Sequence, residues 1–147
     1  MQQQLLNDEG TRTWAVILDT GDEVTGCLLG FASSQGLSAA HLTAIGAFEH
    51  ATLGYFDWQR KDYRRIPVEV QAEVVSLIGD VARAGKEPKL HMHAALGLAD
   101  GSMCGGHLLN GVVRPTLEVI VTETPSWLRR QHDPETGLAL IRAMPAR

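Results

Sequence analysis

Cysteine is scarce in this chain, and its scarcity excludes a disulfide-stabilised scaffold. The 147 residues contain two cysteines, Cys27 and Cys104, which lie in different segments. Small domains that depend on disulfides carry more cysteines at closer spacing. We therefore expect a reducing compartment and a cytoplasmic location.

An excess of positive charge and long apolar runs are also lacking. The chain has 13 Lys and Arg against 17 Asp and Glu, a formal net charge of −4, so the molecule as a whole is not attracted to nucleic acid or to anionic lipid. Residues 1–9 have neither the basic start nor the apolar centre of a secretory signal, and no segment has the roughly 20 apolar residues of a transmembrane helix. We expect no contact with a membrane.

Several familiar catalytic motifs are absent as well. The sequence contains no serine nucleophile elbow, no phosphate-binding loop, no dinucleotide fingerprint and no internal repeat. With 44% hydrophobic residues it is long enough to bury one core, which predicts a single domain. We expect that domain at 12–143, between an N-terminal extension at 1–11 and a C-terminal end at 144–147.

The apolar residues that are present predict one helix among many strands. They recur at helical spacing from Val24 to Ala32, which predicts an amphipathic helix over 22–35. Thr20 and Glu23 have the spacing of a capping box at its start, and Gly36 is placed to end it. Strands are expected near 12–19, 39–48, 50–57, 68–79, 89–98, 103–112 and 116–123.

The fold class that follows is α+β, a mostly antiparallel β-sheet with one main amphipathic helix packed on it. The polar, basic segment 57–65 is interpreted as a loop. Residues 125–147 are rich in proline and are interpreted as an extended or docking tail.

Three histidines form the most informative pattern in the chain. His91 and His93 are separated by one residue in a predicted strand, so both imidazoles point to one face of the sheet. His107 follows one short hairpin later. The residue that His107 faces depends on the length of the turn between the two strands.

Counting along the hairpin distinguishes two arrangements. A two-residue turn at Asp100-Gly101 pairs His107 with Ala94 and places it on the wrong face. A three-residue loop with Gly101 in the left-handed conformation pairs His93 directly with His107. We predict the three-residue loop, because opposed Cβ atoms then lie roughly 4.5–5.5 Å apart and can share a metal ion.

Three imidazoles with an open fourth position are typical of a divalent metal site, and zinc suits them best. Nickel, copper, cobalt and iron are also compatible with this ligand set. The other histidines have no partners in the local pattern, and we interpret them as structural or surface residues: His41, His50 and His132. Cys104 stands at odd spacing from His107, which predicts that it faces the core instead of the metal.

Ordered blocks over nearly all of residues 12–143 resemble the plants-and-prokaryotes-conserved (PPC) domain family. The blocks are Leu18-Asp-Thr-Gly-Asp-Glu-Val24, Ile45-Gly-Ala-Phe48, Leu53-Gly-Tyr-Phe-Asp57, Glu73-Val-Val-Ser-Leu-Ile-Gly79, His91-Met-His-Ala-Ala-Leu-Gly-Leu-Ala-Asp-Gly-Ser-Met-Cys-Gly-Gly-His-Leu108 and Leu117-Glu-Val-Ile-Val121.

This resemblance implies a PPC-like fold, an antiparallel sheet flanked by helix and assembled as a homotrimer. In prokaryotic members, the histidines that match His91, His93 and His107 form a metal site that is usually zinc. Plant relatives join the domain to an AT-hook, which binds DNA, while the PPC domain mediates self-association and partner binding.

DNA binding is the aspect of the family that this sequence supports least. It contains no Arg-Gly-Arg-Pro hook, so the reader of the minor groove is missing. Its one basic cluster is Arg60, Lys61, Arg64 and Arg65. We interpret that cluster as a solvated loop or a subunit contact, in preference to a phosphate-binding patch.

Three hypotheses for function remain at this stage. The first is a metal-binding trimer that holds a small, anionic molecule near the histidines. The second is a metal-dependent enzyme, with Glu73 or Glu118 as general base or as the group that orients a ligand imidazole. Glu73 lies in an apolar run, where burial would require a partner. The third is a DNA-associated or protein-interaction module.

Overall fold

The chain is built almost entirely from β-strands. The computed structural model describes residues 1–124 and 129–142. Strands contain 67% of these residues and a single short helix contains 8%. The elements are β1 (Gln2–Asn7), β2 (Thr13–Asp19), α1 (Val24–Ser34), β3 (Ala39–Asp57), β4 (Asp62–Val68), β5 (Ala72–Ala84), β6 (Glu87–Gly97), β7 (Met103–Glu123), β8 (Arg129–His132) and β9 (Ala139–Arg142).

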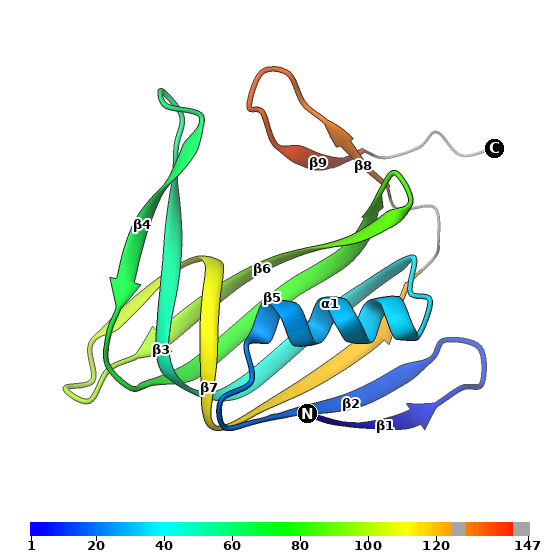
Figure 1. Ribbon diagram of the computed structural model, residues 1–147, viewed down its shortest axis with the longest axis horizontal. Helices are drawn as coiled ribbons and strands as arrows, with labels where there is room; N and C mark the ends of the chain where they lie inside the picture. The colour runs from blue at the N-terminus through cyan, green and yellow to red at the C-terminus, as the bar shows by residue number, and fades with distance from the viewer. Residues whose placement is uncertain (125–128, 143–147) are drawn as a thin grey trace.

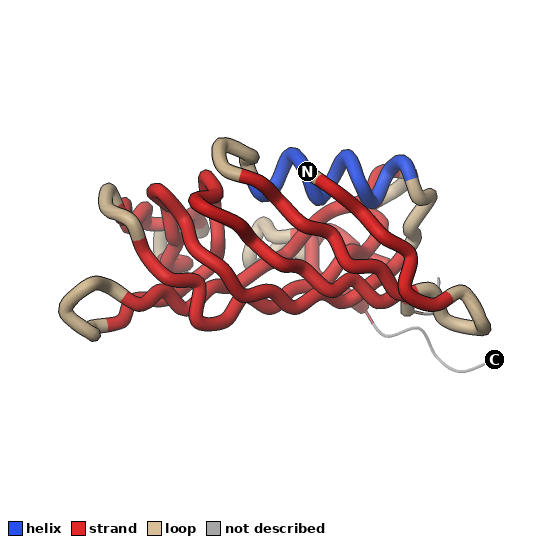
Figure 2. The backbone as a smooth tube through the Cα atoms, turned by 90° about the horizontal axis from the view of Figure 1, so that it is seen from below, coloured by secondary structure: helices blue, strands red, loops and turns tan. Residues whose placement is uncertain are grey.

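The predicted α+β class is therefore wrong, and the fold is mostly β. The α+β class assumes that the helix forms a complete layer on the sheet, but α1 has 11 residues and covers only part of the sheet. Figure 2 shows the helix on one face of the sheet, with no helix of the described residues on the other face.

The helix ends as predicted but begins differently. Glu23 is the N-cap, and its side chain accepts hydrogen bonds from the backbone N–H groups of Thr25 and Gly26. The capping box with Thr20 is wrong, because the Thr20 hydroxyl donates to the Pro115 carbonyl instead. Gly36, at φ +63°, ends the helix as expected, because the left-handed conformation lets its N–H reach the Ser33 carbonyl.

Two pairs of predicted strands merge into single long strands. Segments 39–48 and 50–57 are one strand, β3, and segments 103–112 and 116–123 are one strand, β7. The breaks expected between them are register shifts in the β3–β7 pairing, so the ladder continues past each irregularity. The loop predicted at 57–65 is wrong over its second half, because β4 begins at Asp62 and pairs with β3.

The sheet follows the order β1-β2-β7-β3-β5-β8-β9, with β4 beside β3. β6 pairs with both β5 and β7, so β3, β5, β6 and β7 form a closed circuit of antiparallel pairings. Residues 2–7, which belong to the N-terminal extension expected at 1–11, form the edge strand β1 against β2 (Figure 1).

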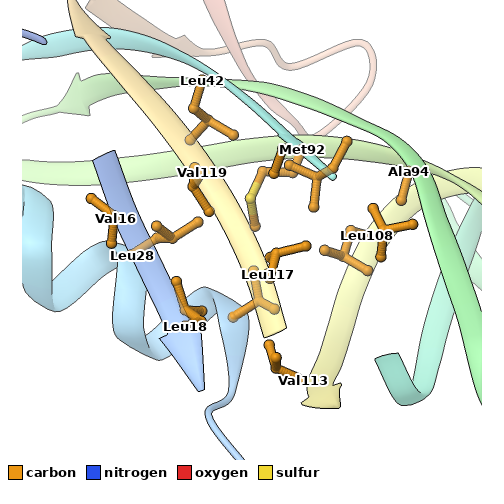
Figure 3. Close-up of a cluster of buried hydrophobic side chains, with 14 of the residues drawn as sticks. Val16, Leu18, Leu28, Leu42, Met92, Ala94, Leu108, Val113, Leu117 and Val119 are labelled. Carbon is orange, nitrogen blue, oxygen red and sulfur yellow. The ribbon is translucent and has the colours of Figure 1, made fainter. Parts of the chain in front are cut away.

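One apolar core lies between the helix and the sheet. Leu28 of α1 lies close to Val16 and Leu18 of β2, and the row continues through Leu117 and Val119 of β7 (Figure 3). These side chains are at most 2% exposed. Because neighbours in a strand alternate, the residues between them face the opposite side of the sheet.

The predicted tail forms a further hairpin over part of its length. β8 pairs in parallel with β5, and β9 pairs with β8. Residues 125–128 and 143–147 lie outside the described residues, and so does the C-terminal end expected at 144–147. Among the described residues, no helix has the length and apolar character needed to cross a bilayer.

Candidate metal centre

The β6–β7 hairpin has the three-residue loop that the sequence predicts. The Leu98 N–H donates to the Ser102 carbonyl at 2.8 Å, and Gly101 takes φ +82°. His93 consequently pairs with His107 across the two strands. The predicted loop and register are confirmed.

This register gathers three imidazoles on one face of the sheet. The ligand nitrogens of His91, His93 and His107 all lie within 4.8 Å of one another. The ring centroids of His91 lie 5.1 Å from those of both His93 and His107. Cys104 packs against the core on the opposite face, as predicted.

The arrangement of the nitrogens fits a divalent ion. The Nε2 atoms of His91 and His93 are 3.2 Å apart. Two nitrogens that bind one ion at 2.0–2.1 Å with near-tetrahedral angles lie about 3.3–3.4 Å apart. The Nδ1 atom of His107 is buried and has no hydrogen-bond partner among the described residues. An ion bound by this atom would provide the partner that a buried polar nitrogen needs.

The electrostatic surroundings lower the pKa of two of the three imidazoles, His91 and His107. Burial, together with smaller effects from His91, His93 and Arg130, lowers the pKa of His107 to about 4. Burial also lowers the pKa of His91, against a smaller opposing effect from Asp80. A neutral imidazole is the form that coordinates a metal, so the site needs no deprotonation of these two residues at neutral pH.

Three residues that the sequence pattern does not indicate surround the histidines. The Tyr63 ring from β4 stacks on His107, with 4.5 Å between centroids and 20° between planes. Asp80 from β5 places Oδ2 3.9 Å from Nδ1 of His91. Arg130 from β8 forms an ion pair with Asp80. They lie 11 to 28 positions along the chain from the nearest histidine of the triad, so no local spacing could have pointed to them.

A hollow of about 370 Å³ opens beside the triad. His91 and His93 of β6, Asp80 of β5, and His41 and Thr43 of β3 are among the residues that line it. His41 is exposed, as are His50 and His132, which agrees with their interpretation as surface residues.

The structure does not bring the predicted carboxylates to the histidines. Glu73 pairs with Gly97 at the far end of β5, whereas Ile78 is the β5 residue that pairs with His93. Five residues of strand separate the two positions, about 16 Å. Glu73 is exposed, and together with Glu118 it lines a separate hollow over Ile45 and Gly46.

The sequence profile of the Plants and Prokaryotes Conserved domain, abbreviated PCC or PPC, matches residues 6–125. The chain belongs to this family. A PPC protein from Pyrococcus horikoshii superposes with a TM-score of 0.85 at 29% identity, over 99% of this chain and 97% of that one.

Two further PPC-like structures differ in what their names state. A protein from Archaeoglobus fulgidus is named as metal-containing, with a TM-score of 0.82 and 31% identity over 97% of both chains. The name of a Ralstonia eutropha JMP134 protein proposes DNA binding, with a TM-score of 0.83 and 27% identity over 89% of this chain and 91% of that one.

One curated relative carries the PPC-like segment as part of a longer protein. The bifunctional protein GlmU of Synechococcus sp. (strain JA-3-3Ab) is 32% identical over 129 residues. This match covers 86% of the present chain, which spans only 20% of the length of that relative.

Proposed function

We propose that this chain is a trimeric PPC domain that binds one divalent metal ion, zinc, through His91, His93 and His107. The observation that carries the proposal is the convergence of three imidazoles from one hairpin, with two Nε2 atoms 3.2 Å apart. The metal-containing relative from Archaeoglobus fulgidus supports it.

A small anionic molecule is the ligand we propose for the hollow beside the ion. A zinc ion held by three protein ligands keeps an open coordination position and acts there as a Lewis acid. The hollow offers room next to that position, where the exposed apolar side chain of Ile78 and the polar side chains of His41 and Thr43 line it. This mixture of apolar surface and a few polar groups is typical of small-molecule sites.

Elemental analysis of untagged protein tests the metal site. We expect about one ion per chain, removable by a strong chelator, because each chain supplies one set of three imidazole ligands. Protein purified without chelator that contains far less than one ion per chain, and that takes up no added zinc, would contradict the proposal.

The trimer is supported by an apolar surface on the helix-free face of the sheet. Ile45, Ile78 and Ile120 lie there with 42% to 60% of their surface exposed. They come from three adjacent strands, and Thr43 pairs with both Ile78 and Ile120. An exposed apolar patch of this kind is typical of a protein–protein interface.

Light scattering tests the assembly. We expect a mass of three times the 16.0 kDa chain for the wild-type protein, and the chain mass for Ile78→Glu, because a carboxylate in an apolar interface is left desolvated and unpaired. Leu6→Glu, at an exposed apolar position on the edge strand β1, is the control and should leave the trimer intact. A wild-type mass of 16.0 kDa would overturn the trimer.

DNA binding is the second candidate function. The exposed basic residues Arg60, Lys61, Arg64 and Arg65 gather at the β3–β4 hairpin, and the name of the Ralstonia eutropha relative proposes DNA binding. A patch of four cations predicts gel retardation at low salt, with an affinity that falls about 100-fold between 50 and 200 mM salt. Absence of retardation at low salt would eliminate this candidate.

A cytoplasmic location is part of the same proposal. Cys27 and Cys104 are unpaired in the structure. Free thiols persist in reducing compartments, which supports this location.

A further inference from the structure

Arg130 reaches the histidine site from a part of the chain that the family profile does not include. The profile ends at residue 125, and Arg130 lies on β8, which pairs in parallel with the end of β5. Only 6% of its side chain is exposed. A guanidinium is rarely buried without an ionic partner, so the contacts of this side chain matter.

The Arg130 guanidinium joins the β8–β9 hairpin to the centre of β5. One terminal nitrogen, Nη1, donates to the Ala139 carbonyl at 2.9 Å. The other, Nη2, donates to Oδ1 of Asp80. Because both ends of the planar fork are engaged, the side chain holds Asp80 in one orientation.

Asp80 uses its second oxygen toward the metal centre. Oδ2 faces Nδ1 of His91 at 3.9 Å, which is too long for a direct hydrogen bond. The other ring nitrogen of His91, Nε2, lies 3.2 Å from Nε2 of His93. The carboxylate therefore faces the nitrogen that points away from the triad.

We propose that Arg130 is a positioning residue for the metal centre, acting through Asp80 to direct Nε2 of His91 toward the ion. The inference rests on the proposed function. A carboxylate that faces the non-coordinating nitrogen favours the tautomer with the proton on Nδ1 and leaves the Nε2 lone pair free to bind metal. Arg130 keeps the carboxylate in that place. The β8–β9 hairpin thus completes a site whose ligands all lie on β6 and β7.

Zinc affinity of four proteins tests the inference. We expect Arg130→Gln and Asp80→Asn each to weaken zinc binding about tenfold, in the range typical of groups that orient metal ligands. The zinc affinity of the double variant should be at most about twofold lower than that of the single variant with the lower affinity. Both substitutions break the same chain of contacts, so their effects should not add. Arg142→Gln is the matched control. It removes the ion pair of Arg142 with Asp133 in the same hairpin without touching Asp80, and it should leave zinc affinity unchanged within twofold.

A second measurement separates positioning from a general loss of structure. Nitrogen NMR of the His91 ring in metal-free protein should show the proton on Nδ1 in the wild type and a mixture of tautomers in Arg130→Gln. Arg130→Lys, which keeps the charge, should recover part of the zinc affinity. If Arg130→Gln fails to fold, zinc affinity and the His91 ring signals are measured on Asp80→Asn and Arg130→Lys instead.

Unchanged zinc affinity together with unchanged His91 ring signals in Arg130→Gln would overturn the inference. A wild-type protein that binds no zinc would overturn the proposed function instead. In that case the ring signals of His91 still decide whether Arg130 and Asp80 orient the imidazole.

Discussion

Replacing His91 with alanine is expected to weaken zinc binding by more than about 100-fold, because groups that merely orient a metal ligand already contribute 10- to 100-fold. His91 supplies one of three nitrogens, and the two that remain cannot form the three-ligand shell of an open zinc site. Its neighbour Asp80 forms an ion pair with Arg130 that does not involve His91, so the variant should keep this pair and the fold should be preserved. Competition with a chromophoric chelator measures the change in affinity.

His41→Ala is the matched control for this experiment. His41 is an exposed histidine on the same face of the sheet, and it lines the hollow beside the triad without belonging to it. Its removal should change zinc affinity by less than about threefold. This change is smaller than the loss expected when a group that orients a metal ligand is removed. Equal losses in His91→Ala and His41→Ala would contradict the assignment of the three ligands.

Replacing Gly46 with alanine is expected to lower the free energy of unfolding by about 2–6 kcal/mol. Gly46 has φ +150°, and a Cβ built on it would lie 2.3 Å from the Thr116 carbonyl oxygen and 2.8 Å from Cα of Leu117. Both neighbours are backbone atoms of β7, so the clash can be relieved only if β3 and β7 separate. Domains of this size are stable by about 5–15 kcal/mol, so the loss is a large part of the total.

Urea unfolding at a fixed protein concentration measures this loss, and Gly30→Ala provides the control. Gly30 is exposed in α1, and nothing lies within 4 Å of the added Cβ. Alanine there should raise the free energy of unfolding by about 0.5–1 kcal/mol, because it restricts the unfolded chain in a helical position. A Gly46→Ala protein as stable as the wild type would show that β7 does not approach β3 as closely as the structure has it.

The histidine triad was predictable because it depends on short-range geometry. One intervening residue places His91 and His93 on the same face, and the loop that ends at Gly101 sets the register that brings His107 opposite His93. Strand alternation and turn length are local properties, and they are encoded within 17 consecutive residues. The placement of Cys104 toward the core followed from the same alternation.

The small share of the fold that is helical and the lengths of the strands could not be predicted from such local geometry. Breaks expected in β3 and β7 are irregularities within continuous strands, because pairing with neighbouring strands carries the backbone across them. The basic segment 57–65 looked like a loop, yet its second half pairs with β3. Pairing of this kind depends on a partner strand and leaves little trace in the segment itself.

The sequence by itself determined the register of one hairpin and the three imidazoles that this hairpin presents, whereas the α+β class predicted from it was wrong. Only the tertiary structure decided what surrounds them, including Tyr63 over His107, Asp80 beside His91, and Arg130 behind Asp80. The tertiary structure also places Glu73 far from the histidines, in contrast to its predicted role at the site. The physical reason is the separation in sequence between the residues involved. Strand alternation and turn geometry depend on near neighbours, whereas the residues around a site come from strands that meet only when the sheet is assembled.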